Sequence, residues 1–505
     1  TTNTNWNTAG NWANSSLPPT NYNVIIPDVT NDPVISSTAT ANCNNLTIES
    51  GATFAIQSDI SGTGSLIIDG ALTNSGTITM QRYFPGATLL NWHMVSAPVT
   101  GMDISESGFN PGSSDDFYAW LETSPGIWVN YKNTGTSPTF SEVNGNDNFQ
   151  PAKGYLVAYN EANPTKTFTG TLNTGNQTFT LKNSGAKDWT YVTGWNLLGN
   201  PYSSSIDWNL VTRTQFQDNY AYVYDPNAGG GAGAFVNING ANASAYIAPN
   251  QGFFVIATTA ANDQTFTFTN AIQAHGGSYM KNKTDEEKLV LRLSDEIYFD
   301  EIQIRLAPQS TYNREREDAI KIYSYNDVAP QLQSYSSDNI PLAVNSIPEA
   351  GTDNNIPIGI RSPKDGVYKI SIVEVSDIIS TNGIYLEDLL MNSWHKLSES
   401  GYTFTSPEGD ISDRFIIHFG GVGIDEPVST KEIIHLWTAD HTIHLLNSNN
   451  LSGKVIVINM YGQQVLETPL DRDVDQQISL ITPAGYYIVN IVTKNGVINK
   501  KVYLR

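Results

Sequence analysis

The chain has 505 residues, of which 39% are hydrophobic and only 15% are charged, and its formal net charge is -22. This length predicts about three to five domains, and the hydrophobic content excludes wholesale disorder. The acidic balance disfavours nucleic-acid binding, because phosphates would be repelled. No apolar run approaches the roughly 20 residues that span a bilayer as a helix.

Residues 1–84 are predicted to form a first unit of short strands. Apolar pairs recur in NLTIESGATFAI and GSLIIDGALTNSG, with Gly or Asn at the corners. This pattern favours the stacked parallel strands of a β-solenoid, with a small β-sandwich as the alternative. The single cysteine, Cys43, lies in this unit. It excludes an intramolecular disulfide, and we expect it to be buried and unreactive.

Residues 85–275 contain an internal repeat. NWHMVSAPV at 91–99 matches GWNLLGNPY at 194–202, and FQPAKGYLV at 149–157 matches IAPNQGFFV at 247–255. Two tandem β-sandwich-like units, 85–186 and 187–275, are therefore predicted. Core packing is the first explanation for their many Trp and Tyr residues. The alternative is an exposed platform that stacks on sugar rings, and its candidates are Trp120, Trp128 and Trp208.

The charge density places a further boundary near residues 276–287. The first 275 residues hold 7 basic and 18 acidic side chains, and the last 230 hold 20 and 31. Clean alternation in IQIRL and YKISI predicts a β-sandwich domain over 280–423. Residues 384–394 (IYLEDLLMNSW) form one of very few helix-like patterns. A linker over 420–429 (GGVGIDEPVS) then leads to a last β unit, 425–505. The whole chain is thus predicted to be all-β and multidomain.

Motifs of common enzymes are missing from the sequence. It contains no HExxH, GxSxG, P-loop or GxGxxG pattern, so no catalytic residue is assigned. The adjacent carboxylates Asp115-Asp116 and Asp300-Glu301 point to opposite faces of a strand, which argues against a hydrolytic pair. No cofactor is predicted, except that Asn144–Asn148 and Asp225–Asn227 offer oxygen ligands for a structural calcium ion. Turn chemistry explains both segments as well.

The last unit carries a set of spaced motifs. It reads GKVIVINMYGQQVLE at 453–467 and PAGYYIVNIVTKNGVINKKVYL at 483–504. It resembles the type A C-terminal sorting domain of substrates of the type IX secretion system of Bacteroidetes. The matching positions are Gly453, Val455, Val457, Gly462, Val465, Gly485, Tyr487, Val489, Lys500 and Val502. The resemblance implies an Ig-like β-sandwich that acts as a secretion signal. It also implies recognition by an outer-membrane shuttle barrel and translocon.

Two further segments resemble proteins of the same phylum. Residues 280–423 are similar to the β domain often placed before such tails, and the opening NWNTAGNWANSSLPPTNYNVIIP is similar to N-terminal repeats of large surface proteins. The start at Thr1 instead of Met favours a processed chain. We therefore expect a secreted cell-surface protein that passes through the periplasm. Its passenger would bind a surface, in adhesion, gliding-associated contact or glycan capture. The alternatives are an extracellular hydrolase and a structural accessory of the secretion or gliding apparatus.

Overall fold

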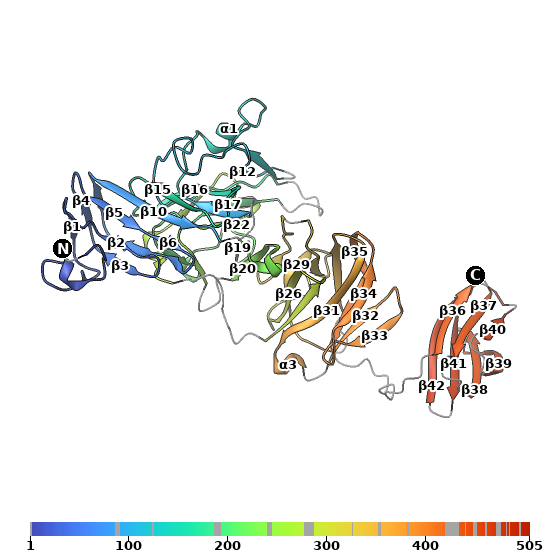
Figure 1. Ribbon diagram of the computed structural model, residues 1–505. Helices are drawn as coiled ribbons and strands as arrows, with labels where there is room; N and C mark the ends of the chain where they lie inside the picture. Colours follow the sequence, from blue (N-terminus) through green and yellow to red (C-terminus); the bar gives the residue numbers. More distant parts are fainter. Residues whose placement is uncertain are drawn as a thin grey trace. The chain divides into compact units, whose positions relative to one another are not determined.

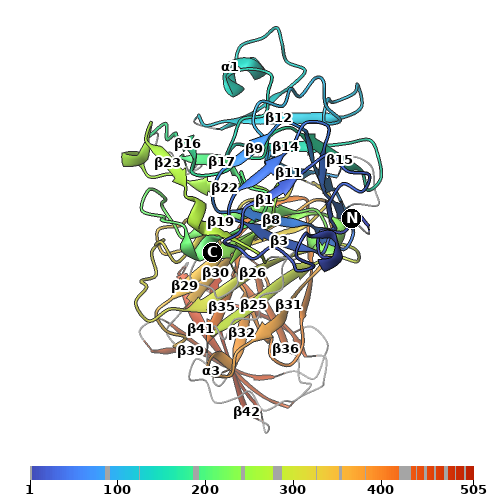
Figure 2. The same cartoon turned by 90° about the vertical axis from the view of Figure 1, so that its left-hand side faces the viewer.

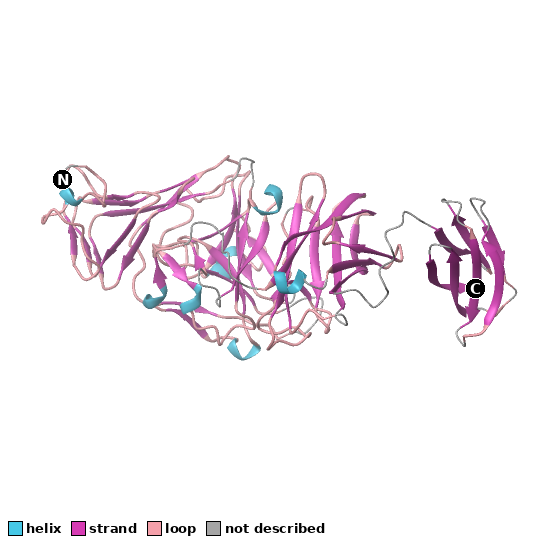
Figure 3. Ribbon diagram, turned by 90° about the horizontal axis from the view of Figure 1, so that it is seen from below, coloured by secondary structure: helices cyan, strands magenta, loops and turns pink. Residues whose placement is uncertain are grey.

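The computed structural model confirms the all-β class, and strands dominate the chain (Figure 3). It describes every residue except 1–2, 86–90, 124–125, 186–192, 240–244, 277–286, 326, 352–354, 381–382, 420–433, 440, 448–451, 460–461, 471–475, 481, 484, 494–495 and 505. The predicted linker and nearly all of the predicted boundary at 276–287 thus lie outside the described residues. Contacts divide the chain into unit 1, Thr1–Val422, and unit 2, Gly423–Arg505 (Figure 1).

Unit 1 begins with the predicted parallel β-solenoid. Its three sheets are β1 (Val24–Ile26), β4 (Leu46–Ile48) and β9 (Leu72–Asn74); β2 (Val34–Ile35), β5 (Thr53–Ile56) and β10 (Thr77–Tyr83); and β3 (Thr40–Cys43) with β8 (Ser65–Ile68). All of these pairs are parallel. A small hairpin, β6 (Ser58–Asp59) and β7 (Gly62–Thr63), interrupts the second turn of the solenoid.

The interior of the solenoid is apolar because alternate residues of each strand point inward. Phe54 and Ile56 of β5 are buried in this way, and so is Cys43 of β3. Burial, followed by the charge of Asp69, raises the pKa of the Cys43 thiol to about 12. The prediction of a buried cysteine is confirmed.

The two copies of the repeat have the same strand arrangement. The first copy pairs β10 with β15 (Thr165–Thr169) and orders its sheet as β11 (His93–Ser96), β14 (Gly154–Ala158), β12 (Asp116–Leu121) and β13 (Ile127–Asn130). The second pairs β16 (Gln177–Thr180) with β23 (Thr265–Phe268) and orders its sheet as β17 (Trp195–Gly199), β22 (Gly252–Ile256), β19 (Tyr220–Asp225) and β20 (Ala234–Asn239). The last solenoid strand, β10, is thus also the first strand of the repeat. A small sheet of β21 (Tyr246–Ile247), β18 (Ser205–Asp207) and β24 (Gln273–Ala274) accompanies the second copy.

A local two-fold axis relates the two repeats where they meet. Val95 bridges Gln251, and Lys153 bridges Leu198. In the sequence repeat Val95 corresponds to Leu198 and Lys153 to Gln251, so each contact is the symmetry mate of the other, as at a two-fold dimer interface. Figure 2 shows β12, β14 and β11 beside β17, β22 and β19. The two sheets therefore present a joined surface to the next domain.

Residues 288–419 form one eleven-stranded sheet. Its strands are β25 (Lys288–Ser294), β26 (Phe299–Leu306), β27 (Ala319–Ile320), β28 (Gln331–Tyr335), β29 (Pro341–Ile347), β30 (Asn355–Ser362), β31 (Gly366–Val375), β32 (Ile384–Asp388), β33 (Ser393–Lys396), β34 (Tyr402–Ser406) and β35 (Gly409–Phe419). The sheet curls until its ends meet, since the Tyr402 hydroxyl of β34 donates to Asp388 of β32 at 2.9 Å. A sandwich of two separate sheets is predicted for this domain, but its two layers are formed by one continuous sheet.

The helix-like pattern of residues 384–394 does not form a helix. The segment forms the hairpin of β32 and β33 instead. Ile384, Leu386 and Asp388 point inward at every second position, and β32 pairs along its whole length with β35. This tertiary pairing overrides the local pattern. The structure describes only short helices: α1 (Phe140–Asn144), α2 (Ala228–Gly231), α3 (Asp377–Ser380), and the 3-10 turns Ala9–Asn11, Trp208–Leu210, Thr259–Ala261 and Asn270–Ile272. Among the described residues, no helix has the length and hydrophobicity to cross a membrane.

Unit 2 is a β-sandwich with its own core. One sheet orders β36 (Ile434–Ala439), β37 (Thr442–Asn447) and β40 (Gln476–Ser479). The other orders β39 (Gln464–Leu470), β38 (Gly453–Asn459), β41 (Gly485–Thr493) and β42 (Gly496–Leu504). Apolar side chains from both sheets pack between them, including Ile443, Leu445, Val455 and Ile491.

Candidate functional site

The valines and the tyrosine of the predicted sorting motif form the core of unit 2. Val455, Val457 and Val489 are fully buried, Tyr487 and Val502 nearly so, and Val465 packs against them. The Tyr487 hydroxyl donates to the Pro483 carbonyl at 2.7 Å, which ties the start of β41 to the segment before it. These positions therefore shape the sandwich.

The glycines of the motif meet steric needs. A Cβ atom at Gly453 would lie 2.1 Å from the carbonyl oxygen of Val492 on the neighbouring strand. Gly462 has a φ of 79° in the turn after β38, a conformation that favours glycine. Gly485 opens β41, and Lys500 is half-buried opposite Val489. These motif positions are thus explained by the folding of unit 2 itself, and the side chains that it exposes are different ones.

The outward face of β41 and β42 carries such side chains. Because strand residues alternate in direction, Tyr486 and Ile488 point away from the core on β41, and Lys501 and Tyr503 do so on β42. The rings of Tyr486 and Tyr503 lie 5.1 Å apart, and the Lys501 ammonium lies 4.2 Å from the Tyr486 ring centre. Tyr486 is 52% exposed and Tyr503 is 47% exposed. We call these four residues the outer aromatic face.

Sequence reasoning missed the outer aromatic face, although the run Tyr486–Val489 (YYIV) signals it. An antiparallel strand with one solvated face alternates apolar and polar residues. Four apolar or aromatic residues in succession leave two of them in solvent. Exposed apolar groups gathered on one face mark interaction sites more often than single ones do.

The aromatic candidates of the repeats lie in packed surroundings. Trp208 is 0% exposed, stacks on Phe216 at 5.9 Å, and donates its indole N–H to the Asn219 carbonyl at 2.8 Å. For Trp208 the alternative of sugar stacking is wrong, because neither ring face is open, and core packing, the first explanation, applies.

Trp120 and Trp128 are half-buried between the repeats and the next domain. Their rings lie 4.9 Å apart, and both meet Phe254 edge to face, at 5.1 and 5.7 Å. Trp120 donates its indole N–H to the Trp195 carbonyl at 2.7 Å, and Trp128 contacts Tyr325 at 6.0 Å. Core packing therefore accounts for both residues.

The polar candidates for catalysis and calcium binding have structural roles. Asp115 accepts hydrogen bonds from the amides of Gly112 and Asn160, and Asp300 pairs with Lys321. The Asn144 side chain donates to the carbonyls of Asn146 and Asn148, both at 2.8 Å, as turn chemistry predicts. No group of three or more His, Cys, Asp or Glu residues in the described part of the chain could hold a metal ion.

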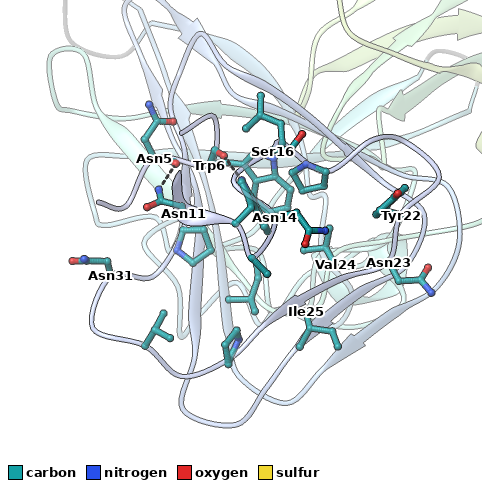
Figure 4. A pocket seen from close by; sticks show the side chains of 18 of the residues that line it. Asn5, Trp6, Asn11, Asn14, Ser16, Tyr22, Asn23, Val24, Ile25 and Asn31 are labelled. Carbon is teal, nitrogen blue, oxygen red and sulfur yellow. Dashed lines mark hydrogen bonds between the residues drawn. The ribbon is translucent and has the colours of Figure 1, made fainter. Parts of the chain in front are cut away.

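A cavity of about 690 Å³ lies at the N-terminal end of the solenoid. Figure 4 shows Asn5 and Asn11 on one side of it, Tyr22 and Asn23 on the other, and the β1 residues Val24 and Ile25 along its wall. Its size falls within the range of small-molecule sites, about 300–1,000 Å³. The sequence contained a signal for it, since Asn, Trp and Tyr crowd into residues 3–23.

Hydrogen bonds hold the wall of this cavity in place. Trp6 donates its amide to the Val34 carbonyl at 2.9 Å, which adds the N-terminal segment to the sheet of β2. The Trp12 indole donates to the Trp6 carbonyl at 2.8 Å. The side-chain amide of Asn11 donates to the side-chain oxygen of Asn3 at 2.9 Å and to the Asn5 carbonyl at 2.8 Å. The cavity is therefore largely preformed.

Comparison with known proteins yields one family. The family described as a domain of unknown function (DUF8693) matches residues 1–224 and again residues 209–419. The matched ranges end where β35 ends, within unit 1. No curated protein matches the chain.

Proposed function

The chain belongs to the DUF8693 family, a family of unknown function, and from its own residues we propose that it is a secreted cell-surface protein. Unit 2 is the export signal, recognised by the shuttle barrel and translocon of a type IX secretion system in the outer membrane. Unit 1 is the passenger, an adhesin-like module that binds a surface after transit through the periplasm.

One observation carries this proposal: the motif-bearing segment is a compact unit separate from the rest of the chain. The contact boundary lies between Val422 and Gly423. Among the described residues, the apolar core of unit 2 is built from buried side chains within 443–504, with partly buried neighbours such as Leu436. An export signal that is recognised on many different cargo proteins must fold independently of the cargo. A self-contained core supports that role.

The outer aromatic face is the surface that the partner would contact. Tyrosine supplies a large contact area at low conformational cost and is enriched at the centres of interfaces. Tyr486, Tyr503 and Ile488 offer that area on one strand pair, and Lys501 adds a positive charge beside it. The buried motif residues would then hold the outer aromatic face in position without contacting the partner themselves.

The passenger role rests on the composition and build of unit 1. Its surface is rich in uncharged polar residues, and its rigid solenoid ends in a preformed cavity. Asp115 and Asp300, the carboxylates considered for hydrolysis, are engaged in structural contacts. Binding to a surface is therefore favoured over turnover.

A reporter experiment tests the export claim. Residues 425–505 are fused to a fluorescent protein that carries a periplasmic leader, and the fusion is expressed in a bacterium with a working type IX system. We expect the reporter in the medium or on the cell surface. Retention in the periplasm, while a known cargo is exported from the same cells, would refute the assignment of unit 2.

A variant of the full chain tests the recognition surface. Tyr486→Ser with Tyr503→Ser should reduce recovery of the shuttle barrel in a pull-down from native outer membranes. Trp394→Ser is the control, because Trp394 is 43% exposed but lies in unit 1, outside the N-terminal cavity. Equal recovery by both variants would show that the outer aromatic face is not the contact. Circular dichroism of each variant checks that unit 2 remains folded.

A further inference from the structure

We infer that the cavity at the N-terminal end of the solenoid is a binding site for a neutral oligosaccharide. The inference rests on the proposed function, because it names the ligand class that the surface-binding passenger would capture. It replaces Trp120, Trp128 and Trp208 with a different set of residues.

The first argument is the charge of the wall. None of the twenty residues that line the cavity is Asp, Glu, Lys, Arg or His. A phosphate, carboxylate or ammonium group would find no counter-ion there, and burying an unpaired charge is costly. The net charge of -22 further disfavours polyanions. The ligand is therefore uncharged.

The second argument is the chemistry of the amides. Six of the lining residues are asparagines: Asn3, Asn5, Asn11, Asn14, Asn23 and Asn31. A carboxamide has an acceptor oxygen and a two-proton NH2 donor, so it can still donate to a ligand when its oxygen is bonded within the protein. Sugars present hydroxyl and ring oxygens all around the ring that accept such hydrogen bonds.

Several of these amides are already oriented. The side-chain oxygens of Asn3 and Asn5 accept hydrogen bonds from the backbone N–H groups of Asn5 and Asn7, both at 2.9 Å. The side-chain oxygen of Asn23 accepts one from the Asn45 side chain at 2.8 Å. Among the described residues, the Nδ2 groups of Asn3, Asn5 and Asn23 have no hydrogen-bond partner. Anchoring the oxygen fixes the plane of the amide, so its N–H groups are held ready for a ligand, which lowers the entropy cost of binding.

The third argument is the aromatic and apolar part of the wall. Tyr22 is 52% exposed and Ile25 is 60% exposed at the cavity. The Trp12 ring is half-buried and held by its bond to Trp6. The apolar C–H face of a sugar ring packs on such surfaces while its hydroxyls reach the amides.

An extended peptide is the competing ligand, because β1 is an edge strand. Val24 donates to the Asn45 carbonyl and Ile26 accepts from the Glu49 amide, so the backbone groups of Ile25 point to the open edge. However, Pro27 follows β1 directly, and Pro18, Pro19 and Pro33 also line the cavity. Proline cannot extend a strand ladder, so a peptide would pair along about one residue here.

Isothermal titration calorimetry on the full chain tests this inference. The probes are cellohexaose, maltohexaose, chitohexaose and mannohexaose, with hexagalacturonate as the anionic comparison and a short poly(Thr-Val) peptide as the strand comparison. We expect at least one neutral hexasaccharide to bind. Tyr22→Ala should weaken that binding about tenfold, whereas Trp394→Ala, at an exposed aromatic residue of unit 1 outside the cavity, should bind as the wild type does.

Each other outcome has a distinct meaning. Binding of only the anionic probe or only the peptide would overturn the ligand class, and binding that Tyr22→Ala leaves unchanged would overturn the location. Failure of all neutral probes, repeated on an array of neutral surface glycans, would overturn the inference. If the chain still bound intact cells in that case, the surface-binding passenger would stand without this site. The reporter assay on residues 425–505 is unaffected by any of these results.

Discussion

The buried ion pair between Asp388 of β32 and Arg414 of β35 lies where the two ends of the eleven-stranded sheet meet, because Asp388 also bonds Tyr402 and Arg414 bonds the Thr405 carbonyl, both on β34. Replacing Asp388 should weaken this closure. The two side chains are only 1% and 6% exposed, and they meet at 2.7 Å. Asp388 also accepts the Tyr402 hydroxyl at 2.9 Å and the amides of Leu390 and Met391 at 3.0 and 3.1 Å. One carboxylate thus connects β32, its turn, β34 and β35.

Asp388→Asn keeps an acceptor but leaves the buried guanidinium without a counter-charge. Breaking a buried pair from one side costs about 3–5 kcal/mol, so the free energy of unfolding should fall by that amount. Asp410→Asn is the matched control, because Arg361 and Asp410 form an Arg–Asp pair in the same sheet with side chains 42% and 61% exposed. Exposed pairs contribute about 0–1 kcal/mol.

The effect should also depend on pH. Burial raises the pKa of Asp388, but the hydrogen bonds from Arg414, Met391 and Tyr402 outweigh it and hold the pKa below its ordinary 3.8. The carboxylate therefore stabilises the fold above pH 3.8, and this contribution is lost as the pH falls through the folded-state pKa. Urea unfolding followed by circular dichroism at pH 7 and pH 3 measures both quantities. Equal losses for Asp388→Asn and Asp410→Asn at pH 7 would refute the reasoning, as would an undiminished gap at pH 3.

Three further predictions follow from buried side chains of unit 1. Trp208→Ala should lower the free energy of unfolding by about 3–5 kcal/mol without changing oligosaccharide affinity in calorimetry. Weaker oligosaccharide binding with unchanged stability would show instead that Trp208 is a binding residue. Cys43 should resist iodoacetamide at pH 8 in the native protein and react in urea, because burial raises its pKa to about 12; rapid native labelling, read by mass spectrometry, would contradict its burial. Burial, followed by the charge of Arg82, lowers the pKa of His93 to about 3. Stability should therefore fall as the pH drops from 6.5 toward 3, by up to about 1.4 kcal/mol per pH unit, and His93→Gln should flatten this slope in thermal melts.

Local patterns in the sequence predicted the strand class, the solenoid and the tandem repeat. Inward residues at every second position, as in β5, mark a strand wherever they occur. Trp92 directly precedes β11 and matches Trp195, the first residue of β17. Gly154 and Gly252 are the first residues of β14 and β22. Such signals need only neighbouring residues or a comparison of the chain with itself.

The tertiary structure decided which face of each strand stays open. Trp208 and Tyr486 are both aromatic residues in β-rich segments, yet one is fully buried and the other is half exposed. The hairpin of β32 and β33 depends on pairing with β35. The asparagine-lined cavity forms only where residues 3–23 fold back over β1. Pairing and packing between distant segments set these features, because a strand has two equivalent faces until another element covers one of them.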